Sequence, residues 1–179
     1  MKLKNTTMLA SLVFGVFSSS VAMSAENTTF PFTTEQFINN QNQAYTQKNI
    51  DFKVTIESQK GNETVLVTKP DDAKNKTGLN FITQTLKSDP QSHKVQSATM
   101  KINYENTSAY GLYMIVNYAA FAVAAQNSTN KNNDIPLPDF TGWDVSKLAN
   151  VDRTVTQNNV TYHLIQKGHD VTIEATPAQ

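Results

Sequence analysis

Apolar and polar residues alternate along several short stretches of this chain, and this period of two predicts a sheet. Two such stretches, 52–58 and 64–68, flank the turn residues Lys60, Gly61 and Asn62 and predict an antiparallel hairpin. A further strand is expected over 94–104. Three more are expected near the C-terminus, over 152–156, 160–166 and 171–175.

The turn at Gly61 resembles a second turn at Gly168, which suggests an internal repeat. The apolar positions around the two turns argue against one. The first hairpin is expected to bury Val54 and Ile56, and the second is expected to bury Tyr162 and Leu164. When the two turns are aligned, these two buried pairs are offset by one residue. A displacement of one residue exchanges the two faces of a strand. We therefore interpret the similarity as two alike turns.

Apolar residues follow helical spacing in two other segments. Thr33 and Gln36 form a capping-box pattern, and Phe32 and Phe37 are spaced for a hydrophobic staple, so an amphipathic helix is expected to run from Thr33 to about Lys48. The alanine-rich stretch 108–126 predicts a long apolar helix.

The segment 79–86 fits both periods. Leu79, Ile82 and Leu86 fit one helical face, whereas Leu79, Phe81, Thr83 and Thr85 fit one face of a strand. Length favours neither, and we expect a short helix.

These elements together predict the α+β class. We expect an antiparallel sheet of about five to six strands, with one long apolar helix packed on a face and an N-terminal amphipathic helix.

The first 25 residues have the layout of a secretory signal peptide. Lys2 and Lys4 precede an apolar run over 8–17, and small residues follow over 18–25. Cleavage is expected between Ala22 and Ala25, which leaves 26–179 as a single α+β domain. The apolar run is too short for a permanent membrane span, so no membrane association is expected after cleavage.

The amino-acid composition indicates the compartment of the protein and the classes of partner to expect. The chain has no cysteine and a formal net charge of zero, with Arg153 as its single arginine. A disulfide-free exported domain is typical of a bacterial periplasmic or secreted protein, and thiol chemistry is excluded. Nucleic-acid binding requires clustered basic residues, so no nucleic-acid partner is expected.

Recognisable catalytic, nucleotide or metal motifs are missing from the sequence, and no cofactor is expected. His163 and His169 flank one predicted turn and, with Asp170, offer metal ligands. Their spacing matches no established zinc pattern, and a solvent-facing strand residue plus a turn residue is the simpler interpretation.

The sequence therefore favours a non-catalytic periplasmic protein-binding module, such as an inhibitor or immunity-type factor, whose partner is another protein. The alternative is a small periplasmic hydrolase or metal-dependent enzyme that uses the histidines of the C-terminal hairpin. Aromatic residues are enriched at binding hot spots. The candidate binding surface follows from that enrichment and comprises Leu137, Asp139, Phe140, Trp143 and Asp144.

Overall fold

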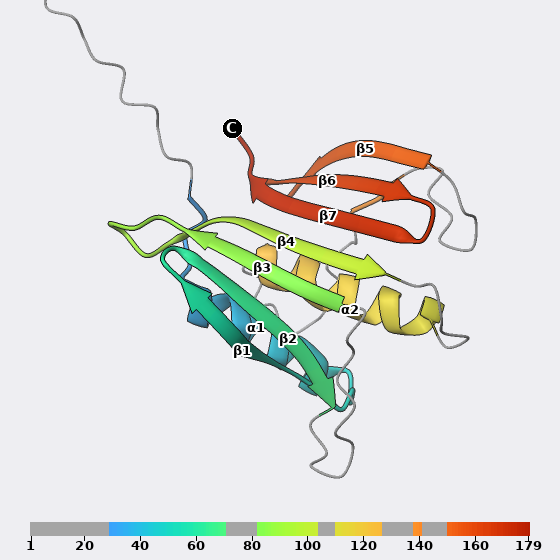
Figure 1. Cartoon of the computed structure of the whole chain (residues 1–179), viewed down its shortest axis with the longest axis horizontal. Coiled ribbons are helices and arrows are strands. Elements are labelled where there is room, and N and C mark those ends of the chain that lie inside the picture. Colours follow the sequence, from blue (N-terminus) through green and yellow to red (C-terminus); the bar gives the residue numbers. More distant parts are fainter. Residues whose placement is uncertain (1–28, 71–81, 104–109, 127–137, 141–149) are drawn as a thin grey trace, which may run out of the picture.

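The computed structural model describes residues 29–70, 82–103, 110–126, 138–140 and 150–179. It has the mixed α+β architecture expected from the sequence, with an antiparallel sheet and two helices on one of its faces (Figure 1). The elements in chain order are α1 (Thr34–Gln47), β1 (Phe52–Lys60), β2 (Glu63–Pro70), β3 (Ile82–Ser88), β4 (Val95–Asn103), α2 (Tyr110–Ala125), β5 (Asn150–Gln157), β6 (Val160–Lys167) and β7 (Asp170–Pro177).

Seven strands form the sheet in the order β1-β2-β3-β4-β7-β6-β5, which is more than the five to six expected. Strands β1 to β4 run as one meander and β5 to β7 as another. The two meanders join where β4 pairs with β7, so that Met100 lies opposite Ile173 in the middle of the sheet. Strands β1 and β5 are the two edges.

The additional strand is β3, where a short helix was expected over 79–86. That expectation was wrong from Ile82 onward. The segment pairs with β2 on one side and β4 on the other, and Ile82, Gln84 and Leu86 are buried at every second position. Two strand neighbours satisfy its backbone hydrogen bonds and bury one of its faces, which a single helical turn in this place would not do.

The expected burial of the first hairpin is correct at Val54 and wrong at Ile56. Val54 is 1% exposed, whereas Ile56 is 49% exposed. Ile56 lies opposite Leu66 and therefore belongs to the helix-side face, but it lies on the edge strand, next to an irregularity between Ile56 and Ser58. The second hairpin buries Tyr162 and Leu164 as expected.

The start of α1 has the local signals that the sequence predicted. The Thr33 hydroxyl accepts a hydrogen bond from the Gln36 backbone N–H, and the Gln36 side chain accepts one from the Thr33 N–H, which completes a capping box. The rings of Phe32 and Phe37 are 6.0 Å apart. Phe30 stacks on Phe32 at 4.8 Å and its N–H donates to Val95 O, so the segment before α1 is joined to β4.

Helix α2 packs against α1 through small and aromatic side chains. Phe121 meets Phe37 edge-on at 5.8 Å, and Ala120, Ala122 and Ala124 are buried. Ile115 on α2 is 51% exposed. Neither described helix is long and apolar enough to cross a membrane.

A buried polar network lies between the two helices and the sheet. The Tyr45 hydroxyl donates to Asn117 Oδ1 at 2.6 Å and accepts from Gln41 Nε2 at 3.4 Å. On the sheet, Gln84 Nε2 donates to the Thr68 hydroxyl at 3.5 Å. Burial raises the pKa of the Tyr45 hydroxyl far above its usual range, so it remains a neutral donor. Within this network the bond from Tyr45 to Asn117 joins α1 to α2.

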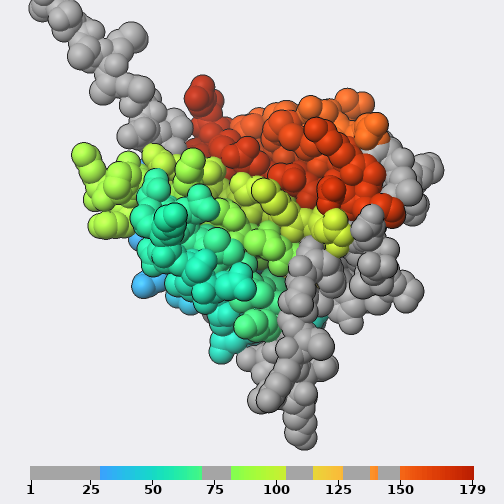
Figure 2. Space-filling view, viewed as in Figure 1, coloured from blue at the N-terminus to red at the C-terminus, as the bar shows by residue number. Residues whose placement is uncertain are grey.

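The opposite face of the sheet carries neither described helix (Figure 2). Threonines recur on it in register: Thr85 lies opposite Thr99, and Thr83 opposite Lys101. Polar and β-branched residues of this kind suit the solvated face of an antiparallel sheet.

Candidate functional site

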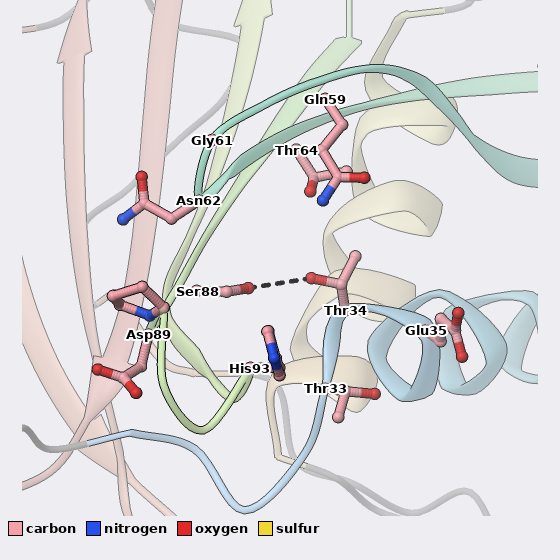
Figure 3. A pocket seen from close by; sticks show the side chains of 11 residues that line it. Thr33, Thr34, Glu35, Gln59, Gly61, Asn62, Thr64, Ser88, Asp89 and His93 are labelled. Atoms are coloured by element: carbon pink, nitrogen blue, oxygen red, sulfur yellow. Dashed lines mark hydrogen bonds between the residues drawn. The ribbon is translucent and has the colours of Figure 1, made fainter.

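A polar groove of about 680 Å³ opens at the end of the molecule where α1 begins (Figure 3). Three chain segments line it: the first turn of α1, the tip of the β1–β2 hairpin, and the loop between β3 and β4. Its lining residues are Thr33, Thr34, Glu35, Gln59, Gly61, Asn62, Thr64, Ser88, Asp89, Pro90 and His93.

Hydrogen bonds hold the three segments together. The Ser88 N–H donates to Asn62 O at 2.8 Å, which ties the loop after β3 to the β1–β2 turn. The hydroxyls of Ser88 and Thr34 are 3.1 Å apart, which ties the same loop to the start of α1. A bridge between Thr33 and Lys94 adds a third connection. The walls of the groove are therefore a preformed framework.

The β1–β2 turn requires a residue with a left-handed backbone. Gly61 has φ +61°, and a Cβ added there would meet nothing within 4 Å, so the requirement is one of backbone conformation alone. Asn62 follows Gly61 and completes the two-residue connection between Lys60 and Glu63.

Asp89 organises the loop between β3 and β4. Its Oδ1 accepts hydrogen bonds from the N–H groups of Gln91 and Ser92 and from the Ser92 hydroxyl, at 3.1, 2.7 and 2.9 Å. The bonds from Ser92 lower the pKa of the Asp89 carboxyl below its ordinary value, so the group is an anion that accepts hydrogen bonds. His93 follows in a left-handed conformation, with φ 57°.

The groove offers hydroxyl, amide and imidazole groups beside the carboxylates of Glu35 and Asp89. Hydroxyls come from Thr34, Thr64 and Ser88, an amide from Gln59, and an imidazole from His93. In Figure 3 the Ser88 and Thr34 hydroxyls point toward each other, with the His93 ring beside them. A nucleophilic hydroxyl needs a base within hydrogen-bond reach; the contact that Ser88 makes is with another hydroxyl.

The structure describes two members of the candidate surface predicted from the sequence. Phe140 is buried, with its ring 6.2 Å from that of Tyr118, and Asp139 is exposed. Leu137, Trp143 and Asp144 lie outside the described residues. Phe140 therefore contributes to the core, where the Tyr118 hydroxyl also donates to Pro138 O at 3.0 Å.

The histidines of the C-terminal hairpin do not meet in one site. His163 lies opposite Glu174, four residues before the turn that begins after Lys167, or roughly 13 Å along the strand. Its Nε2 is 2.8 Å from Asp152 Oδ1 on β5. His169 lies in the turn. Within the part of the chain that the structure describes, no three potential ligands converge as a metal site.

Sequence reasoning did not find the groove. It identified the turn at Gly61, but the approach of this turn to the loop after β3 depends on the pairing of β2 with β3. With 79–86 expected as a helix, that pairing was not predicted. Searches of protein-family models, curated proteins and solved structures found no match to this chain.

Proposed function

We propose that this chain is an exported bacterial protein that acts in the periplasm or outside the cell as a non-catalytic protein-binding module. The signal-peptide pattern in the first 25 residues supports export. The groove supports binding, because donors and acceptors on a preformed framework recognise a partner at low ordering cost.

The observation that carries the proposal is the set of hydrogen bonds that the polar groups of the groove make within the chain. The Asp89 carboxylate holds its own loop, and the Ser88 hydroxyl faces another hydroxyl. General acid–base catalysis requires a titratable group available to the substrate with a pKa suited to proton transfer. The lowered pKa of Asp89 works against that role for this side chain, which is one of three titratable groups among the described residues that line the groove, with Glu35 and His93. An inhibitor or immunity-type factor that captures another protein fits this arrangement.

Affinity capture of the tagged mature chain, 26–179, from periplasmic and culture extracts tests this proposal. We expect one stoichiometric partner that is lost in Gln59→Arg, since Gln59 is exposed and lines the groove. Gln43→Arg is the matched control: it makes the same change at an exposed position of α1 outside the groove. A partnerless chain, or equal capture by both variants, contradicts the proposal. The surface around Leu137 and Trp143 stays a prediction and is tested in the same assay by Trp143→Ala.

A second candidate function is a small hydrolase that uses His163. The contact between His163 and Asp152 favours it, because a carboxylate can orient an imidazole. Both side chains are solvent-exposed, at 38% and 76% for His163 and Asp152, so they lack the dry pocket in which such pairs are most effective. Hydrolytic activity on esters or peptides that disappears in His163→Gln would establish this alternative.

A further inference from the structure

Strand β1 is an edge of the sheet, and one residue on it already binds an amide from outside the sheet. The Val54 N–H donates to Asn42 Oδ1 at 2.7 Å, and Asn42 Nδ2 donates to Val54 O at 3.0 Å. A side-chain amide carries the same kinds of group as a peptide bond, an N–H donor and a C=O acceptor. Asn42 therefore makes the two hydrogen bonds that a neighbouring strand would make to Val54.

The same edge continues past Asn42. In an antiparallel ladder, residues two apart direct their backbone N–H and C=O groups the same way. Ile56 lies opposite Leu66, two positions on from the pair of Val54 with Thr68, so the N–H and C=O of Ile56 also face away from β2. The described part of the chain pairs β1 with one strand only, β2. Asn42 closes the edge at Val54 and leaves it open at Ile56.

The open edge is next to an exposed apolar side chain and to the groove. Ile56 is 49% exposed and shares the helix-side face with Leu66. Gln59 and Thr64 lie opposite each other beyond the irregularity in β1, and both line the groove. An extended chain on this edge would therefore cover Ile56 and reach the groove within a few residues.

We propose that an extended peptide segment of the partner protein adds to the free edge of β1 at Ile56. It places an apolar side chain over Ile56 and a polar side chain in the groove. This inference rests on the proposed function and names the form of the partner. The outward N–H and C=O of Ile56 are the groups through which an extended chain adds to a sheet edge, and the bonds of Asn42 show that this edge accepts an amide.

The probe for the test is a library of random 12-residue peptides displayed on phage and selected on the mature chain, 26–179. The tightest peptide is then synthesised and titrated by fluorescence anisotropy. Ile56→Pro removes the outward N–H at an edge position where proline is tolerated, and we expect it to raise the Kd at least tenfold. Ile56→Val keeps the N–H and an apolar side chain, and should change the Kd less than twofold.

A second measurement does not depend on how well the proline variant folds. Amide hydrogen exchange followed by NMR should slow at Ile56 when the peptide is added, and stay unchanged at Thr154 on the opposite edge. Two further peptides carry methyl groups on the backbone nitrogens of the odd-numbered or of the even-numbered residues. The one whose methyl groups replace the N–H groups that face β1 should bind at least tenfold more weakly than the unmethylated peptide.

Three other outcomes overturn the inference. Peptide binding that slows exchange around His93 and leaves Ile56 unchanged would place recognition in the groove alone; the proposed function would then stand without the edge. A mature chain that is dimeric by light scattering, and monomeric as Ile56→Pro, would make the occupant a second copy of this chain. Failure to select any peptide, together with failure to capture a partner, would refute both the inference and the proposed function.

Discussion

Replacement of Tyr45 by phenylalanine tests whether the buried polar network stabilises the fold. The substitution removes one hydroxyl from a side chain that is 1% exposed. The ring remains, and so does its edge-on contact with Phe52 at 5.7 Å. The change therefore isolates the hydrogen bonds of the hydroxyl from the packing of the ring.

The expected loss of stability follows from the side chains that lose a hydrogen bond to the Tyr45 hydroxyl. Asn117 Oδ1 loses a donor at 2.6 Å, and Gln41 Nε2 loses an acceptor at 3.4 Å. A buried polar group deprived of its partner costs about 1–3 kcal/mol. The bond to Asn117 is short and the bond to Gln41 is long, so we expect a total loss of about 2 kcal/mol in the free energy of unfolding.

Urea unfolding of the mature chain followed by circular dichroism measures this loss. With a urea dependence of about 2 kcal/mol per M, the midpoint should fall by about 1 M. The double variant Tyr45→Phe/Gln41→Leu is the control. It removes the Gln41 amide that the single variant deprives of its partner, so its cost should be less than the sum of the two single costs. A loss below about 0.5 kcal/mol in Tyr45→Phe would refute the reasoning.

Three further predictions concern pH and a turn. Burial raises the pKa of the Tyr162 hydroxyl from 10.0 to about 12, so the stability it contributes is complete below pH 10 and is lost as pH rises to about 12. Urea unfolding across this range should show a loss of stability that is about 2–3 kcal/mol smaller in Tyr162→Phe than in the unsubstituted chain, in which the buried Tyr45 and Tyr118 hydroxyls contribute the same kind of loss. The pKa of Asp89 is lowered by its bonds from Ser92, so its stabilisation is lost as pH falls below 3.8, and acid titrations of Asp89→Ala should lack that component. Gly168 has φ +60° with open space around its Cβ position, so Gly168→Ala should cost about 1 kcal/mol in thermal unfolding through backbone strain alone; an unchanged Tm would contradict this.

The correct predictions rest on patterns among residues that are close together in the sequence. The capping box of Thr33 and Gln36 and the staple of Phe32 and Phe37 depend on residues three to five apart, and the structure shows both arrangements. The burial of Tyr162 and Leu164 follows from alternation along a strand with neighbours on both sides. In these cases the residues that decide the structure are close in sequence or repeat with one clear period.

The failures have a different physical origin. Over the few residues from Leu79 to Leu86, a helical face and an alternating strand face can both be drawn, and the choice is made by β2 and β4, which pair on both sides of β3. Alternation assigned Ile56 to the correct face, since it lies opposite Leu66. It could not show that this face is left uncovered at the sheet edge, because coverage depends on where α1 packs.

The groove was missed for the same reason as β3. The Ser88 N–H bonds Asn62 O because β3 returns beside β2 and ends level with the hairpin tip. The Thr34 hydroxyl meets Ser88 because α1 begins at that end of the sheet. Each of the three segments has an ordinary sequence of turn and cap residues, and the groove arises only where the topology places them together. In a sheet of hairpins with one edge partly closed by Asn42, the strand order decides both where the groove forms and which backbone groups of the described strands have no strand beside them.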